Sequence, residues 1–284
     1  MNTRTDIRPA EAEAAGQLVQ TRLGQLYVTQ RGHGEAAIVL WPSIFTDHHI
    51  YDALTERLGD RYRFYLIDGP AHGQSAGVPH EFSMQDCAEA FLSVMDHFGL
   101  QSAVVGGTSW GGLVAAELAL AAPDRAQALI LMNTPMEIDG SRPTLSARMI
   151  AAGARWVGNR AFFQNGVAKS FFSPQTLARN QAYRDRFHAM LRAADQTTLA
   201  AAIRSVILRG APLKPRMAAL SVPTLVIAGT EDAMYPITTQ EAAAKQAPQG
   251  SFAAVPGKHI SAVEAPGDVA KTITRFMGEV ATDR

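Results

Sequence analysis

The chain has 284 residues, of which 47% are hydrophobic and 18% charged, so it can bury the core of one large or two small domains. Lys and Arg number 26, as do Asp and Glu, so the formal net charge is +0. Such a chain has no overall field to attract nucleic acid or an anionic membrane, and we expect neither as a partner.

The N-terminal stretch MNTRTDIRPAEAEAAG is polar and is not typical of a secretory signal. No run of about 18 apolar residues follows it, which argues against a membrane-spanning helix. Cys87, the single cysteine, lies in the helical pattern SMQDCAEAFLSVMDHFG, and we expect it to pack in a helix rather than act as a nucleophile. A lone cysteine excludes an internal disulfide framework and fits a reducing, cytoplasmic compartment.

Short apolar runs alternate with helical patterns from about residue 18 onward. We predict strands at residues 24–30, 36–41, 63–68, 102–107, 127–133, 223–229 and 251–256. Helical patterns, such as residues 84–98 and 110–122, lie between most of them. Strands rich in Val, Ile and Leu that are joined by helices predict a parallel sheet buried on both faces. The opening strands, joined by short turns, are expected to form an antiparallel edge.

Residues 104–113, VVGGTSWGGL, place four glycines around Ser109 where a predicted strand runs directly into a predicted helix. Gly107 and Gly111 complete the pattern G-x-S-x-G, which in this context is typical of a nucleophile elbow. The turn is so sharp that a Cβ at either flanking position is expected to clash. No Lys follows the glycines, so a Walker-type phosphate loop is excluded, and the spacing does not fit a dinucleotide fingerprint.

The regular alternation stops after residue 133, and residues 134–211 contain no convincing strand. They are rich in Ala, Arg, Met and aromatic residues, and the clearest helical stretch is ARWVGNRAFFQNGVAKSFF, residues 154–172. An insertion of this length is too long for a plain connection. We expect a helical lid at 134–211 over an α/β core formed by 1–133 and 212–284. A separate helical domain with no role in the site is the alternative.

A nucleophilic serine needs a base, and on such a sheet the acid and then the histidine follow the serine in the chain. Asp232 comes just after the predicted strand 223–229, and His259 lies in the loop after the next strand. Catalytic groups of open α/β sheets collect at the carboxyl ends of the strands. We therefore predict a catalytic triad of Ser109, His259 and Asp232. Glu137 and Asp139 are the alternative acids.

These motifs make the chain similar to an α/β-hydrolase over nearly its whole length. DGPAHGQS, GTSWGG, GTEDAMYP and GKHISAVEAP appear in the family's order. The resemblance implies a mostly parallel eight-stranded sheet with helices on both faces. It also implies a structural role for Asp68 and His72. Within the superfamily, WPSIFTDHH and the run around His259 resemble the 3-oxoadipate enol-lactonase group. An Arg in that group's loop is replaced here by Pro70, which puts its small dicarboxylate substrate in doubt.

The oxyanion hole is expected to use the backbone N–H of Trp110 and a second amide from the loop after residue 41. Pro42 has no N–H, so Ser43 is the first choice and Ile44 the second. Ile44 is also a candidate for the substrate pocket. The aromatic side chains of the lid could line an apolar cavity, or could only pack its helices together; they are Trp156, Phe162, Phe163, Phe171 and Phe172.

These features predict a serine hydrolase of carboxylic esters, preferentially lactones with a bulky apolar or macrocyclic body. The reaction needs no metal and no organic cofactor. Several alternatives remain open: a carbon–carbon hydrolase of ring-cleavage products, a prolyl aminopeptidase, a perhydrolase or haloperoxidase-like enzyme, and a small-molecule receptor without turnover. The Ser109-Trp110 pair is similar to that of prolyl aminopeptidases. The sequence leaves the oligomeric state undetermined.

Overall fold

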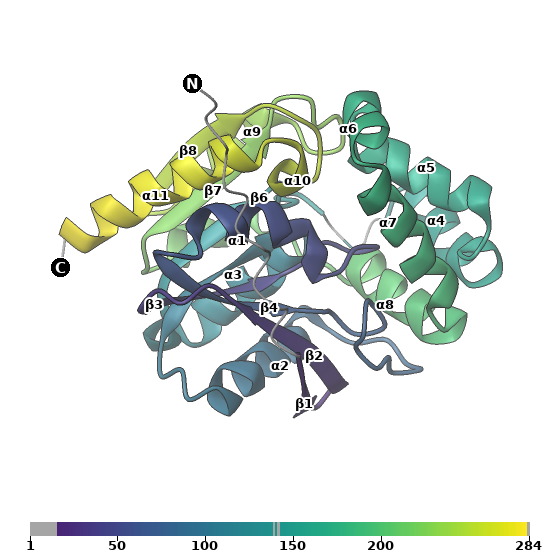
Figure 1. The fold of residues 1–284 in the computed structure, drawn as a ribbon, viewed down its shortest axis with the longest axis horizontal. Helices are drawn as coiled ribbons and strands as arrows, with labels where there is room; N and C mark the ends of the chain where they lie inside the picture. Colours follow the sequence, from purple (N-terminus) through teal and green to yellow (C-terminus); the bar gives the residue numbers. More distant parts are fainter. Residues whose placement is uncertain (1–15, 139, 141–142, 283–284) are drawn as a thin grey trace, which may run out of the picture.

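A computed structural model describes residues 16–138, 140 and 143–282, so the polar N-terminal stretch and Asp139 lie outside the described residues. An eight-stranded sheet with the order β1-β2-β4-β3-β5-β6-β7-β8 forms its centre (Figure 1). The strands are β1 (Gln17–Thr21), β2 (Gly24–Arg31), β3 (Ala36–Trp41), β4 (Tyr62–Ile67), β5 (Ala103–Thr108), β6 (Ala126–Met132), β7 (Thr224–Gly229) and β8 (Gly250–Val255). The expected α/β-hydrolase architecture is confirmed.

The sheet is parallel from β4 to β8 and antiparallel at its opening edge. β1 pairs antiparallel with β2 through a short turn, and β2 pairs antiparallel with β4. The predicted antiparallel edge is present, although β2 and β3, which a short connection also joins, are not neighbours in the sheet. β1 itself is a strand that the apolar pattern did not indicate. Its sequence QLVQT alternates polar and apolar residues, and only Val19 and Thr21 are buried. An edge strand of this kind has too few apolar residues to be recognised from its sequence.

Helices cover both faces of the sheet, which is why β5 and β7 are buried along their whole length. The core helices are α1 (Asp52–Leu58), α2 (Met84–His97), α3 (Trp110–Ala121), α9 (Ile237–Ala244), α10 (Ser261–Glu264) and α11 (Pro266–Thr282). The connection from β3 through α1 leads to β4, toward the β1 edge of the sheet. The connections through α2, α3 and α9 lead the other way, toward the β8 edge. Right-handed crossovers therefore place α1 on the face opposite α2, α3 and α9. α11 packs beside α1.

Five α-helices lie between β6 and β7 in the described part of the chain, and Figure 1 shows them gathered at one side of the sheet. We call them the helical insert; they are α4 (Leu145–Val157), α5 (Ala161–Phe171), α6 (Pro174–Arg179), α7 (Gln181–Ala193) and α8 (Gln196–Leu208). The stretch 154–172, predicted as continuous, is split between α4 and α5. α4 ends at Val157 with Gly158 as its C-cap, and Arg160, with φ of −89° and ψ of 137°, separates it from α5.

The strand order brings the predicted site loops together at the carboxyl ends of the parallel strands. Trp41 in β3 is in register with Gly107 in β5, so the loop after β3 lies beside the elbow. Thr108 is in register with Met132 of β6, and Met132 with Ile227 of β7. Ser109, Asn133 and the loop that holds Asp232 therefore follow one another along one edge of the sheet. Among the described residues, no helix is long and apolar enough to cross a membrane.

Candidate active site

Ser109 occupies a strained turn between β5 and α3. Its φ of 56° and ψ of −111° lie outside the conformations that L-residues usually adopt. Its N–H donates to Met132 O at 2.8 Å, which holds the turn against β6. Its hydroxyl has no hydrogen-bond partner among the residues that the structure describes. The turn thus holds a serine that is only 4% exposed and whose hydroxyl makes no hydrogen bond to a described residue.

The flanking glycines are required by close approach, as predicted. A Cβ on Gly111 would lie 1.9 Å from Trp41 O, and one on Gly107 would lie 2.4 Å from the same oxygen. Gly106 allows β6 to approach, and Gly112 leaves room for the Thr134 hydroxyl. Since backbone atoms cannot give way as flexible side chains do, larger residues at these sites would push α3 away from β3.

Asp232 and His259 form a buried hydrogen-bonded pair. His259 Nδ1 lies 2.8 Å from Asp232 Oδ2, and both side chains are 1% exposed. The rings of Phe171 and Tyr235 flank the imidazole, with centroids 5.0 and 5.3 Å from it. With Nδ1–H donated to the carboxylate, Nε2 of the neutral ring is left as the proton acceptor.

Asn133 is hydrogen-bonded to Asp232 and was not among the site residues predicted from the sequence. Its Nδ2 donates to Asp232 Oδ2 at 3.1 Å and to Lys258 O at 3.2 Å, while its own N–H donates to Ile227 O. Asn133 directly follows β6 and has a φ of 47°, which asparagine tolerates better than most residues. An asparagine at the end of a central strand was the available signal.

Asp232 is surrounded by hydrogen-bond donors. Its Oδ1 accepts from the backbone N–H of Met234 at 3.0 Å, in addition to the two donors on Oδ2. Burial acts to raise the pKa of this carboxyl, but the hydrogen bonds from His259, Asn133 and Met234 outweigh it and hold the pKa below its usual value. Asp232 is therefore a carboxylate at neutral pH. Glu137, the alternative acid, instead pairs with Lys214 at the surface, at 2.8 Å.

The loop after β3 leaves two amides for a second oxyanion contact. The N–H of Phe45 donates to His72 Nε2 at 3.0 Å, and the N–H of Thr46 donates to Ser43 O at 3.2 Å. The amides of Ser43 and Ile44 form no hydrogen bond to any described residue. At the elbow, Trp110 is the first residue of α3, so its N–H has no intrahelical partner. The candidates predicted from sequence stay the same.

Asp68 and His72 support this loop from beneath, as the resemblance implied. Asp68 Oδ1 accepts from the N–H and Nδ1 of His48, both at 2.8 Å, and Oδ2 accepts from Gln74 N at 2.8 Å. Burial lowers the pKa of His48, but the bond to Asp68 outweighs burial and the pKa lies above its ordinary value. His72 fixes the neighbouring turn, where Phe45 has a φ of 63°.

Acid is expected to destabilise the fold through His72. Burial lowers its pKa to about 4, although the Pro70 carbonyl and Asp68 act to raise it. Between pH ~6.5 and ~4 the unfolded chain binds a proton that folded His72 does not. The free energy of unfolding therefore decreases as the pH is lowered through this range, by up to about 3 kcal/mol. Urea unfolding of His72→Gln at pH 7 and pH 5 is expected to give a smaller pH dependence than the wild type.

The matched control for that measurement is His33→Gln, whose imidazole is 67% exposed. It is expected to keep the wild-type pH dependence. If the free energy of unfolding changed equally between pH 7 and pH 5 in the wild type and in His72→Gln, His72 would not be the cause of the pH dependence.

The structure divides the five lid aromatic residues into three groups. Phe163 and Phe171 face the site, because their rings contact Phe45 with centroids 5.9 and 6.2 Å apart. Phe172 contacts Tyr183 and Phe187 and packs the insert helices together.

Trp156 and Phe162 form the third group, and for them the pocket prediction is wrong. These residues are 75% and 69% exposed and face solvent rather than a cavity. Their helices turn alanines inward, such as Ala154 and Ala168, and that packing leaves the large side chains outside. Ile44 is buried next to the loop amides described above.

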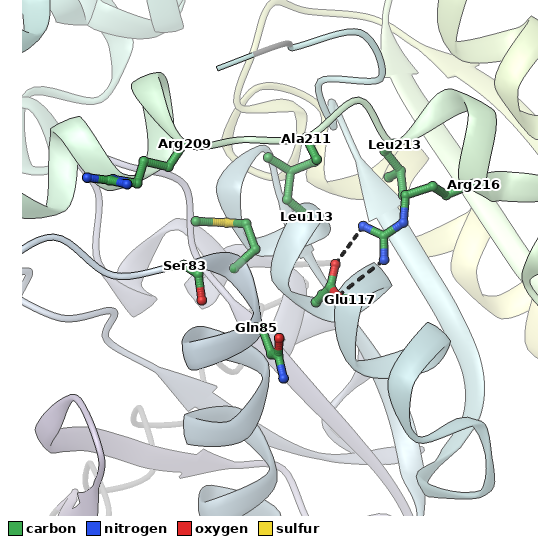
Figure 2. Close-up of a pocket in the computed structure, with 9 residues that line it drawn as sticks. Ser83, Gln85, Leu113, Glu117, Arg209, Ala211, Leu213 and Arg216 are labelled. Atoms are coloured by element: carbon green, nitrogen blue, oxygen red, sulfur yellow. Dashed lines mark hydrogen bonds and ion pairs between the residues drawn. The ribbon is translucent and has the colours of Figure 1, made fainter. Parts of the chain in front are cut away.

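A cavity of about 210 Å³ lies elsewhere, between the start of α2, α3 and the chain after α8. Figure 2 shows its lining, with Glu117 on α3 paired to Arg216 at 2.7 Å. None of the predicted site residues lines it. Among the described residues, no group of three His, Cys, Asp or Glu side chains is arranged to hold a metal ion.

Comparison with known proteins agrees with the fold. Residues 36–266 match the alpha/beta hydrolase fold family. The 3-oxoadipate enol-lactonase 1 of Acinetobacter baylyi is 25% identical over 256 residues, which cover 86% of this chain and 89% of the relative. A hydrolase from Pseudomonas aeruginosa has a TM-score of 0.84 at 28% identity, covering 93% of this chain and 98% of its own. A thermophilic esterase from Thermogutta terrifontis has a TM-score of 0.82 at 26% identity, with 94% and 99% coverage.

Proposed function

The chain belongs to the alpha/beta hydrolase family, and we propose that it hydrolyses carboxylic esters, with a preference for lactones. The observation that carries the proposal is the buried Asp232–His259 pair at 2.8 Å, at the same edge of the sheet as the elbow that holds Ser109 at a φ of 56°. A serine with an unengaged hydroxyl, a base and an acid that orients the base are the parts of a nucleophilic hydrolase.

In the proposed mechanism, Ser109 Oγ attacks the carbonyl carbon while His259 Nε2 takes the hydroxyl proton. Asp232 holds the imidazole in the required tautomer and stabilises the imidazolium that forms. The N–H of Trp110, at the positive end of α3, and the N–H of Ser43 stabilise the oxyanion. His259 then protonates the leaving alkoxide, which gives the acyl-enzyme. Water, deprotonated by His259, releases the acid and restores the serine.

The substrate is proposed to enter when the helical insert moves. Ser109 and His259 are almost fully buried, and Phe171 of α5 contacts the His259 ring. Phe45, Phe163 and Phe171 would then form the apolar walls around an acyl group. This supports the insert, with proposed bounds 134–211, as a lid over the site.

The lactone preference rests on two observations. The residues Ser43, Thr46 and Asp47 follow the enol-lactonase pattern, and a relative with that printed name covers most of the chain. Pro70 stands where that group has Arg, so the proposed lactone has an apolar body rather than a carboxylate. In a lactone the leaving alkoxide stays tethered, and the site must hold the opened chain until water attacks.

Hydrolysis should appear as acid release in a pH-stat. We expect the wild-type protein to release acid faster from lactones of small or large ring than from linear acyl esters of similar size. The preferred ring size would measure the space beneath the insert. Faster release from linear esters would overturn the lactone preference but keep the ester hydrolase.

A prolyl amide and a ring-cleavage diketone complete the panel. Turnover of either, with none of esters or lactones, would replace the proposal by an aminopeptidase or a carbon–carbon hydrolase. Binding of the substrates without any turnover would favour a receptor.

A further inference from the structure

The neutral chain consists of two regions of opposite charge. Residues 134–211, the proposed bounds of the insert, hold 11 Lys and Arg side chains against four Asp and Glu side chains, and the remaining residues hold 15 against 22. The formal net charge of +0 is thus the average of a basic helical insert and an acidic core. A net charge of zero for the whole chain therefore says little about the electric field around the insert, whose own net charge is positive.

Helix α4 turns large apolar side chains to solvent. Leu145 and Met149 are 75% and 66% exposed, and Trp156 completes the row seven residues later. This spacing places all three on one side of the helix. The opposite side carries the buried Ala151 and Ala154 and packs against α8. The helix is amphipathic, but its larger apolar residues face outward.

Arginines without an acidic partner border this row, and the guanidinium of Arg155 lies over the Trp156 ring, 5.6 Å from its centroid. Arg148 and Arg155 lie along one flank of it, and Arg160 follows at the start of α5. All three are exposed, and none has an acidic partner within ion-pair distance in the described part of the chain. By contrast, Arg186, Arg204 and Arg209 of the same insert pair with Asp52 or Glu81.

Helix α5 connects this surface to the site. Phe162 faces solvent at its start, whereas Phe163 and Phe171 contact Phe45, and Phe171 also contacts His259. A partner that contacts Phe162 would therefore touch one end of α5, and the other end of α5 contacts His259, the predicted base, through Phe171. We call the set Leu145, Arg148, Met149, Arg155, Trp156, Arg160 and Phe162 the insert surface.

We propose that the insert surface docks the protein onto an anionic lipid surface, with Trp156, Phe162, Leu145 and Met149 in the headgroup layer and the arginines against lipid phosphates. Protruding aromatic and aliphatic side chains beside arginines are the pattern of interfacial helices. The charge selects an anionic occupant. A second copy joined through the same face is disfavoured because it would bring two strongly basic surfaces together.

Trp156 is a built-in probe of this docking. The chain has three tryptophans, and the other two, Trp41 and Trp110, are fully buried. We would add vesicles of phosphatidylcholine alone, or of an equimolar mixture with phosphatidylglycerol, and measure co-sedimentation and tryptophan emission. Binding to the anionic vesicles, weakened by salt and accompanied by a blue shift that Trp156→Phe abolishes, is the expected result.

Two double variants separate the apolar and charged contributions. Met149→Ser with Trp156→Ser, and Arg148→Glu with Arg155→Glu, are each expected to weaken partition to anionic vesicles by about tenfold or more. Leu18→Ser and Arg275→Glu change an exposed apolar and an exposed cationic residue outside the insert, and should leave partition unchanged. Ser109→Ala should bind as the wild type does, so this proposal is independent of the proposed chemistry.

Three outcomes would overturn the docking proposal. The first is absence of partition to anionic vesicles, and the second is partition that leaves Trp156 emission unchanged. The third is a concentration-dependent blue shift without vesicles, together with a larger sedimenting species, which would make a second copy the occupant.

Discussion

Replacing Ser109 by Ala is expected to lower kcat by about 10⁴ to 10⁶ on the best substrate of the pH-stat panel. The change removes the proposed nucleophile and leaves His259, Asp232 and the oxyanion amides in place. Removing one hydroxyl should not unfold the protein, because the Ser109 Oγ has no hydrogen-bond partner among the described residues. Alanine at a φ of 56° keeps the strain that serine already bears. The measurement is single-substrate kinetics together with urea unfolding.

Ser261→Ala is the matched control for that experiment. Ser261 is also buried, and its hydroxyl too lacks a described hydrogen-bond partner. Its removal is expected to change kcat by less than about tenfold, since it takes no part in the proposed chemistry. Turnover by Ser109→Ala within tenfold of the wild type, with the fold intact, would refute the proposed nucleophile.

Asp232→Asn is expected to lower kcat by about 10⁴. Its Oδ1 accepts from Met234 N, so the new amide group would take the Oδ2 position, which faces Asn133 Nδ2 and His259 Nδ1. There the amide donates where the carboxylate accepted. His259 Nδ1 is forced to become an acceptor, which places the proton on Nε2 and blocks proton transfer from Ser109. Kinetics at neutral pH measure the loss.

The control for this variant is the alternative acid, changed by Glu137→Gln. Its side chain is bound to Lys214 at the surface, and we expect kcat to stay within about twofold of the wild type. A loss with Glu137→Gln larger than that with Asp232→Asn would move the acid to the end of β6. Nuclear magnetic resonance of the His259 ring nitrogens would test the tautomer change directly.

The elbow could be predicted from the sequence because its cause is local. Four glycines around Ser109 have a cost in any regular strand or helix, and the apolar runs on either side define a strand and a helix. The order of Ser109, Asp232 and His259 then follows from where parallel strands end. The structure agrees with the predicted elbow, since the Trp41 carbonyl approaches Gly107 and Gly111 too closely for any Cβ.

Features that depend on a partner element could not be predicted in the same way. Asn133 gains its contacts only when the β6 end meets the loops that carry Asp232 and Lys258. The helical pattern of 154–172 did not show that the chain would leave the helical conformation at Arg160 and form two helices. Trp156 and Phe162 are large aromatic residues of the kind that line apolar pockets. They face outward because their helices pack small alanines against the rest of the insert.

The sequence alone therefore determined the parallel sheet, the elbow and the order of the predicted catalytic groups, because strand hydrophobicity and glycine sterics act over a few neighbouring residues. The tertiary structure alone decided which side chains surround Asp232 and which aromatic residues face the site. It also decided where the charge of the insert is displayed. Those properties depend on distances between segments that are far apart in the chain, and helical periodicity fixes the faces of a helix without saying which face will be covered.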